Sequence, residues 1–326
     1  MRVGIVGAGM AGLGAARELA AAGHLPVVFD SHTVPGGRLS TLRTEGFVFD
    51  MGATFVAPRD RALARVMSTE LDRSGVDAVA LPVYWHTGLH PSPGDSPKAD
   101  DERYVYERGN DELARLLAEG LELRLGQTVL ELEIRGKSYV ARDEEFDALI
   151  VTAPAPEAAR LLATIDLRRS LANCTYRMCL SVALGYGRAL PHLPYCALVD
   201  PLQRHPLTWL SFESLKCPGR APEGCAAIVA QLSAEFSLAH MDADESVIVS
   251  TTVAFLERLL GPGWDSPTVA RVFRWPYGRP ENIGLFDAVN NPGSRVLVAS
   301  DGLSGPRVEY AYEVGVRTAR MLLEAI

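Results

Sequence analysis

A glycine-rich turn near the start of the chain constrains its fold more than any other sequence feature. Gly7, Gly9 and Gly12 form the pattern GxGxxG directly after the apolar run at residues 2–6. A helix-like segment and a second apolar run follow, and that run ends in Asp30. The first glycine allows a tight turn, the second lets backbone N–H groups approach a pyrophosphate, and the third lets helix and sheet pack closely. We therefore predict a βαβ unit that binds a dinucleotide, with Asp30 accepting hydrogen bonds from ribose hydroxyls.

The order of the remaining segments predicts an α/β protein with two sheets. Apolar runs and helix-like segments continue to about residue 155, which is typical of a Rossmann-type domain with a parallel sheet. Alternating strands then predominate, and they predict an inserted α+β domain with a mainly antiparallel sheet. A strand, a glycine loop and a long helix end the sequence and rejoin the first domain. We expect a discontinuous cofactor-binding domain and a substrate-binding domain, with residues 1–80, 101–155 and 290–326 in the first and residues 81–100 and 156–289 in the second.

Composition narrows the class of protein and of partner. The 326 residues are 48% hydrophobic and 22% charged, which is usual for a folded globular protein. The net charge of −8, without a dense cluster of basic residues, argues against nucleic-acid binding. No apolar run is long enough to span a membrane, so we expect a soluble, cytoplasmic protein that acts on a small molecule without an obligate protein partner. The five cysteines are odd in number and lack metal-ligand spacing, so we expect reduced thiols and no metal.

The loop after the second apolar run decides between nicotinamide and flavin cofactors. It reads VPGGRLST and contains Gly36, Gly37 and Arg38, and a Met-Gly-Ala stretch with Gly52 and Ala53 follows. This part of the chain resembles the second flavin-binding motif of the amine oxidase superfamily, and the resemblance implies FAD as the cofactor. The paired glycines would let the chain approach the cofactor, and Arg38 would offer a fork to a phosphate or carbonyl. Gly52 and Ala53 would leave room for the isoalloxazine ring. Since no cysteine motif for covalent flavin attachment is present, we expect noncovalent FAD.

The segment ASDGLSGPRVEYAYEVG, residues 299–315, resembles the motif with which this superfamily closes over the flavin. The resemblance implies that Asp301 meets the ribityl or pyrophosphate region. It also implies that the helix after Arg307 points its positive N-terminus at the pyrimidine end of the ring. Val129 matches the place where the family's chain returns beside the adenine, although a plain core valine fits the same pattern. The expected FAD-binding residues are Gly7, Gly9, Met10, Ala11, Gly12, Asp30, Ser31, Gly36, Gly37, Arg38, Gly52, Ala53, Val129, Asp301, Arg307 and Val308.

Within the superfamily, the chain resembles the renalases nearly end to end. The matching segments include GGRLST, FDMGATFVAPRD, APEAARLLA, RVFRWPYGRP and the two glycine motifs. The chain departs from the renalase pattern at GNDEL and at Glu309–Tyr310. The resemblance implies oxidation of dihydropyridine isomers of NAD(P)H, with a hydride passing to FAD, electrons passing on to O2, and hydrogen peroxide as product. Two alternatives stay open: an amine oxidase or desaturase that acts on another small metabolite, and a flavin-bound protein that binds without turnover.

Trp275 and Tyr277 are the candidate catalytic residues, together with Arg307. The two aromatic residues alternate along one predicted strand, so both rings lie on the same face, although a packing role explains either ring alone. A donor that already carries a hydridic C–H needs little acid–base help, so the lack of an evident base is no obstacle. We expect the substrate site at the interface of the two domains, over the flavin ring. Lys216 lies outside any recognisable amine oxidase motif, and the sequence assigns it no role.

Overall fold

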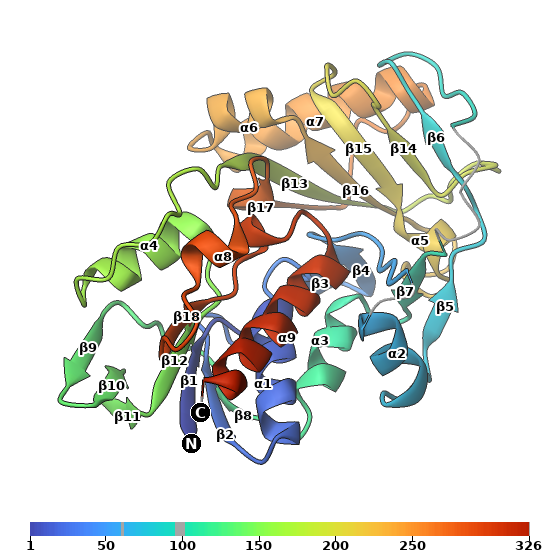
Figure 1. The fold of residues 1–326 in the computed structure, drawn as a ribbon. Helices are drawn as coiled ribbons and strands as arrows, with labels where there is room; N and C mark the ends of the chain where they lie inside the picture. Colours follow the sequence, from blue (N-terminus) through green and yellow to red (C-terminus); the bar gives the residue numbers. More distant parts are fainter. Residues whose placement is uncertain (60–61, 95–101, 326) are drawn as a thin grey trace.

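One half of the molecule is built on a parallel sheet, as Figure 1 shows. The computed structural model describes residues 1–59, 62–94 and 102–325 of the chain. The strand order in this sheet is β18-β12-β1-β2-β8, and every neighbouring pair is parallel. Its strands are β1 (Arg2–Val6), β2 (Leu25–Phe29), β8 (Glu122–Arg124), β12 (Ala148–Val151) and β18 (Val296–Val298).

Apolar residues predominate in the central strands of this sheet because both of its faces are covered. Every residue of β12 and β18 is buried, and Ile5 of β1 pairs with Val28 on one side and Ile150 on the other. Helices α1 (Met10–Ala21) and α9 (Val308–Glu324) lie together on one side of the sheet (Figure 1). Helix α4 and a small antiparallel sheet lie on the other side, and these elements are α4 (Ala155–Ala163), β9 (Leu132–Arg135), β10 (Ser138–Ala141) and β11 (Glu144–Phe146).

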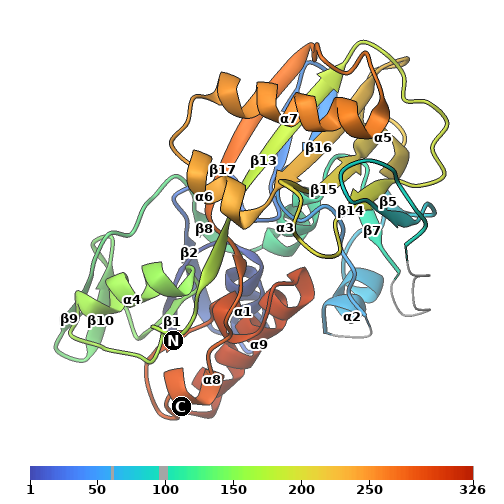
Figure 2. The same cartoon turned by 90° about the horizontal axis from the view of Figure 1, so that it is seen from above.

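The other half of the molecule is a six-stranded sheet in the order β17-β13-β16-β15-β14-β6. Its pairs are antiparallel except for the last one, in which β6 runs parallel to β14. Helices α6 and α7 cover one face, as Figure 2 shows, and Ile248 and Leu256 of α7 join the hydrophobic cluster there. These elements are β6 (Val83–Trp85), β13 (Tyr176–Tyr186), β14 (Ala197–Val199), β15 (Leu207–Phe212), β16 (Ala226–Leu232), β17 (Val269–Pro280), α6 (Ala234–His240) and α7 (Glu245–Leu260).

The opposite face of the six-stranded sheet packs against a hairpin from the first half of the chain. Phe47 and Phe49 of β4 stack on each other and join a cluster with Ala183, Ala227 and Val229 of the large sheet. This cluster brings the segment after β4 against the antiparallel sheet. The remaining elements are β3 (Thr41–Thr44), β4 (Phe47–Asp50), α2 (Ala62–Thr69), β5 (Val76–Ala78), β7 (Tyr104–Tyr106), α3 (Asp111–Ala118), α5 (Glu213–Lys216), α8 (Phe286–Val289) and the 3₁₀ turn η1 (Asp301–Leu303).

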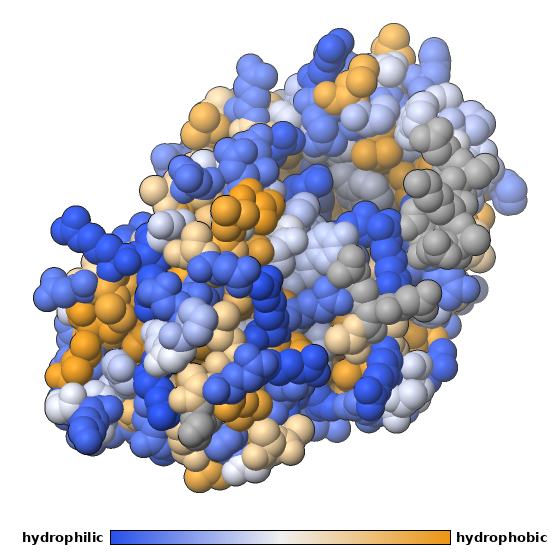
Figure 3. Space-filling model, in the orientation of Figure 1, coloured by the Kyte–Doolittle hydropathy of each residue, from blue (hydrophilic) through white to orange (hydrophobic). Residues whose placement is uncertain are grey.

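This architecture confirms the predicted fold class, with a parallel Rossmann-type sheet and a second, mainly antiparallel sheet. The exact residue ranges of the two domains stay a prediction, and the expected boundary at residues 100–101 lies outside the described residues. The five cysteines carry free thiols. No helix in the described parts of the chain is long and apolar enough to cross a membrane. Hydrophilic residues cover most of the face drawn in Figure 3, where hydrophobic residues form scattered groups.

Candidate active site

A cavity of about 980 Å³ lies where the carboxyl ends of the parallel strands face the antiparallel sheet. Its walls come from the loops after β1, β2 and β12, from strands β13, β15, β16 and β17, and from the start of α9. Ligands of doubly wound sheets bind at this edge, outside the carboxyl ends of the strands. Every predicted FAD-binding residue except Gly12 lines this cavity, and so do Trp275 and Tyr277.

The glycines of the first motif have two distinct roles. Gly7 has a φ of +114°, and a Cβ on Gly12 would lie 1.8 Å from the carbonyl oxygen of Gly7. These two glycines therefore shape the turn itself, which explains why Gly12 lies behind the cavity wall. A Cβ on Gly9, in contrast, would meet no protein atom within 4 Å, although Gly9 lines the cavity. The space beside Gly9 is a cradle that a side chain would fill.

Helix α1 begins at this cradle with an uncapped N-terminus. Gly9 is the residue before the helix, no side chain caps it, and the first turn carries no acidic residue. Met10 and Ala11 line the cavity, so the positive end of the helix faces it. A pyrophosphate is the group that such a helix end and an adjoining glycine bind. The cradle therefore fits the diphosphate of FAD.

Asp30 is held at the end of β2 with its carboxylate in the cavity wall. Its Oδ2 accepts a hydrogen bond from the amide N–H of Ala8 at 2.7 Å, and its Oδ1 accepts one from that of His32 at 2.8 Å. Oδ1 also lies 3.0 Å from Nδ1 of the His32 ring, so Oδ2 is the oxygen with a further lone pair for a ribose hydroxyl. Ser31 and Val129 lie in the same wall, and Val129 is at the same time part of the hydrophobic core. Val129 is therefore a core residue that also reaches the cavity, and its place beside the adenine stays a prediction.

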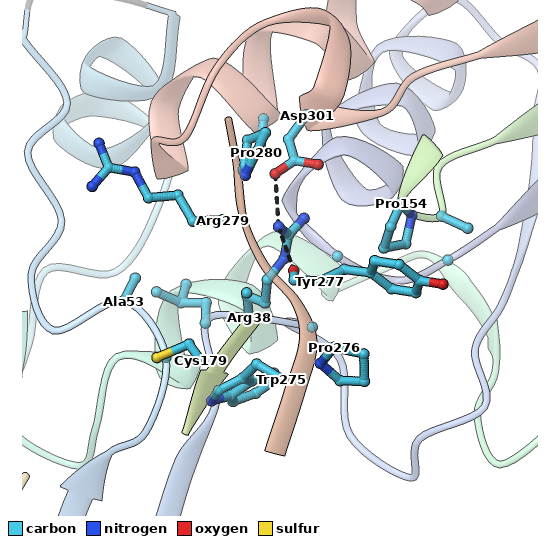
Figure 4. A pocket seen from close by; sticks show the side chains of 18 of the residues that line it. Arg38, Ala53, Pro154, Cys179, Trp275, Pro276, Tyr277, Arg279, Pro280 and Asp301 are labelled. Atoms are coloured by element: carbon cyan, nitrogen blue, oxygen red, sulfur yellow. Dashed lines mark hydrogen bonds and ion pairs between the residues drawn. The ribbon is translucent and has the colours of Figure 1, made fainter. Parts of the chain in front are cut away.

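Arg38 and Asp301 bind each other at the centre of the cavity, as Figure 4 shows. The nitrogen Nη1 of Arg38 lies 2.8 Å from Oδ2 of Asp301 and also donates to the carbonyl of Tyr277 at 3.1 Å. Tyr176 donates from Oη to Oδ1 of Asp301 at 2.8 Å. The sequence led us to expect each charged group on the cofactor. The structure instead shows that they also lock the glycine loop, strand β17 and the closing motif together.

Gly52 is required for a different reason from the one expected. A Cβ on Gly52 would lie 1.8 Å from the carbonyl oxygen of Arg38, and the amide of Ala53 donates to that same oxygen at 2.9 Å. The missing side chain of Gly52 therefore lets its segment pass close to the carbonyl of Arg38. Leaving room for the isoalloxazine ring is not its sole role. Gly52 and Ala53 nevertheless both line the cavity.

The two candidate aromatic residues belong to β17 and stand in the cavity wall (Figure 4). Trp275 donates from Nε1 to the carbonyl of Met51 and to Oγ of Ser181, at 3.2 Å each. The ring of Tyr277 packs edge-on against Tyr176, with 5.6 Å between the ring centroids. Both rings therefore combine packing contacts with a surface toward the cavity, so the packing role and the site role are compatible.

Sequence reasoning missed several polar residues that strands β13 and β16 place in this wall. Gln231 donates from Nε2 to the carbonyl of Gly52 at 2.7 Å, and Ser181 is fully buried beside Trp275. Burial raises the pKa of the Cys179 thiol to about 11, so this cavity-lining group is neutral near pH 7. A polar residue within a strand that is otherwise apolar was the signal that could have found Ser181 and Gln231.

Lys216 lies behind the cavity in a buried charge cluster, which we define as Asp50, Glu213, Lys216 and Arg220. None of these four side chains is exposed to solvent, and none of them lines the cavity. Burial alone would raise the pKa of Asp50, but Lys216 and Arg220 lower it below its usual range. Burial raises the pKa of Glu213, and the repulsion from Asp50 adds to this increase. The lysine that the sequence left without a role is thus a structural counter-ion.

Two family models match the sequence. Residues 5–69 match the NAD(P)-binding Rossmann-like domain, and residues 97–323 match the flavin-containing amine oxidoreductase model, which therefore covers well over half of the chain. A 4,4'-diapophytoene desaturase of Staphylococcus aureus is 43% identical over 60 residues, and one of Staphylococcus haemolyticus is 47% identical over 60 residues. Each match covers 18% of this chain and only 12% of the relative, so the chain matches about an eighth of those proteins.

Solved structures share the whole fold. Cyclohexylamine oxidase from Brevibacterium oxydans aligns with a TM-score of 0.77 at 12% identity, over 99% of this chain and 98% of that one. Reduced UDP-galactopyranose mutase aligns with a TM-score of 0.76 at 15% identity, over 99% and 95% of the two chains. Identities this low show the fold alone. The family match, in contrast, agrees with a cavity whose glycine cradle, helix end and carboxylate fit FAD, and the chain therefore belongs to the flavin-containing amine oxidoreductases and is an FAD-dependent oxidoreductase.

Proposed function

We propose that this protein is a renalase-like oxidase of dihydropyridine isomers of NAD(P)H, with O2 as the final electron acceptor and hydrogen peroxide as product. One observation carries the proposal. The described cavity-lining residues that come from strands β13, β15, β16 and β17 include no Asp, Glu, His or Lys. This wall therefore supplies aromatic rings, neutral polar groups and arginines, but no group suited to remove a proton near pH 7.

A base-free wall favours one class of donor over the other. An alkylamine is protonated near pH 7 and must lose a proton before it can give up a hydride. A dihydropyridine already carries a hydridic C–H, and it needs only to be held flat against the acceptor. Among the residues that the structure describes, Lys216 is the one lysine of the antiparallel half, and it is bound to Asp50 and Glu213 behind the cavity, so it is not available to an amine. The wall thus supports the dihydropyridine hypothesis over lysine-assisted amine oxidation.

The residues of the chain have separable tasks in this reaction. FAD, when bound, supplies the hydride-accepting ring. Trp275 and Tyr277 offer flat surfaces for a heterocycle, and the two hydrogen bonds of the Trp275 indole fix its ring against Met51 and Ser181. Helix α9 begins at Val308 in the cavity wall, so its partial positive charge favours a ligand that gains negative charge there.

Anaerobic mixing of the FAD-loaded protein with possible donors tests the proposal. We expect the 2- and 6-dihydro isomers of NADH and NADPH to bleach the flavin absorbance, and admission of O2 to restore it with release of hydrogen peroxide. Bleaching by amines alone would contradict the proposal in favour of an amine oxidase, and bleaching by an unsaturated metabolite alone would favour a desaturase. If no donor bleaches the flavin, the protein is a flavin-bound binding protein.

Two aromatic variants locate the reaction. Trp275→Ala and Tyr277→Ala should slow flavin reduction by about 10- to 100-fold and leave the FAD content unchanged, because neither ring belongs to a cofactor motif. Trp85→Ala removes an indole from β6, in the same sheet but outside the cavity, and it should keep the wild-type rate. Equal rates in all three variants would show that the aromatic wall does not contact the substrate.

A further inference from the structure

Three arginines from separate segments line one part of the cavity. Arg177 belongs to β13, Arg279 belongs to β17, and Arg307 immediately precedes α9. Arg177 and Arg279 are direct cross-strand partners in the antiparallel register. Like charges in directly opposite positions of a sheet repel each other and destabilise the pairing. The fold therefore keeps an unfavourable arrangement of two like charges next to this cavity.

Carboxylates of the chain neutralise this group only in part. Arg177 pairs with Glu281 at 2.8 Å, and Arg307 lies 3.5 Å from Glu309. Arg279 has no carboxylate partner among the residues that the structure describes. Desolvation lowers the pKa of Arg279, and the charges of Arg177 and Arg307 lower it further, although an arginine stays protonated at any ordinary pH. The group thus carries about one positive charge that the protein itself does not balance.

We propose that Arg177, Arg279 and Arg307 form a subsite for the phosphate or diphosphate group of the substrate. A carboxylate has two oxygens, and a single guanidinium fork can bind both at once, whereas a phosphate offers at least three acceptor oxygens to forks from different directions. Three arginines on three segments therefore suit a phosphate better than a carboxylate. The assignment of this phosphate to the substrate rests on the proposed function.

This subsite is separate from the place that fits the diphosphate of FAD. The cofactor cradle lies at Gly9 and the start of α1, whereas Arg279 belongs to the antiparallel sheet. In Figure 4 the guanidinium of Arg279 points away from the Arg38–Asp301 pair and to the side opposite the Tyr277 ring. Arg38 is held by Asp301 and Arg274 by the carbonyls of Met241 and Ala243, whereas the charge of Arg279 faces no described carboxylate and can bind a second anion.

A truncated substrate tests the subsite through activity. The 6-dihydro isomer of NADH carries a diphosphate, and the corresponding dihydronicotinamide riboside carries none. We expect Arg279→Gln to raise KM for the dinucleotide about 10- to 100-fold and to leave KM for the riboside and the FAD content unchanged. Arg271→Gln removes the same charge from the same strand outside the cavity and should change neither KM. An equal effect on both substrates, or loss of FAD from Arg279→Gln, would overturn the proposal.

Pyrophosphate binding separates this proposal from the proposed function. Isothermal titration of the FAD-loaded protein with inorganic pyrophosphate should show binding in the wild type and in Arg271→Gln but not in Arg279→Gln. If pyrophosphate binds in this pattern and no dihydropyridine is oxidised, the anion subsite stands and the proposed reaction falls. If dihydropyridines are oxidised and pyrophosphate binding is undetectable or unchanged by Arg279→Gln, the reaction stands and the subsite falls.

Discussion

Removal of one cation from the buried charge cluster tests the electrostatics of the interior. Arg220 lies between two carboxylates, with Nη1 at 2.5 Å from Oδ2 of Asp50 and at 2.8 Å from Oε2 of Glu213. Lys216 supplies the second cation, with Nζ at 3.2 Å from Asp50 and at 2.9 Å from Glu213. The cluster is therefore neutral when all four groups are ionised. Arg220→Met leaves two buried carboxyl groups with one cation.

Loss of one partner from a buried ion pair costs about 3–5 kcal/mol of stability, because a buried charge is left uncompensated. The cluster can recover part of this loss by binding one proton, and Glu213 is the site because its pKa is already raised. The ordinary pKa of a glutamate carboxyl is about 4.3. When folding raises this pKa, the stabilising contribution of the carboxyl is fully present at a pH below about 4.3 and is lost as the pH rises through the raised pKa. The stability deficit of Arg220→Met should therefore shrink as the pH falls, by at most about 1.4 kcal/mol per pH unit.

Urea unfolding of the FAD-loaded protein, followed by tryptophan fluorescence between about pH 5.5 and pH 8, measures this deficit. We expect the difference in the free energy of unfolding between wild type and Arg220→Met to be largest at the alkaline end. The double variant Glu213→Gln with Arg220→Met keeps one ion pair, so it should be more stable than the single variant at pH 8 and lack the extra pH dependence. A deficit that is constant over this range would refute the proton-uptake argument, and the absence of any deficit would refute the ion-pair argument.

The cavity supports three more expectations. Gly9→Val should fold, because a Cβ there meets no protein atom, but should not retain FAD; a yellow, fully loaded variant would contradict the cradle. Arg38→Met removes both the ion pair with Asp301 and the hydrogen bond to the Tyr277 carbonyl. This variant should have a lower FAD content and slower anaerobic flavin reduction, by up to about 100-fold. Wild-type values of both would mean that these two contacts are dispensable. Burial raises the pKa of the Cys179 thiol to about 11. The rate of its alkylation by iodoacetamide, followed by mass spectrometry, should therefore rise steadily from about pH 7 to pH 10. A rate that stops rising before about pH 10 would show a more acidic thiol.

The local part of the fold was predictable from the sequence. The apolar runs, the three glycines and Asp30 lie within one βαβ unit, where the order of residues along the chain sets their order in space. The start of α9 directly after Arg307 was predictable for the same reason. Successive side chains of a strand point to opposite faces, so residues two positions apart share a face. Trp275 and Tyr277 were therefore predictable on one wall of the cavity from the strand alone.

Contacts between distant segments were decided by the tertiary structure alone. The bond from Arg38 to Tyr277 joins residues 239 positions apart, and no periodicity in the sequence encodes such a pairing. The opposition of Arg177 and Arg279 depends on the register of β13 and β17, which shifts immediately afterwards at an irregularity in the pairing. Sequence pattern determined which groups the chain could bring to the cavity, because periodicity and turn chemistry are local. Which charges meet, and which one stays unbalanced, depends on register and packing across the whole molecule, because only these bring residues from different segments within bonding distance.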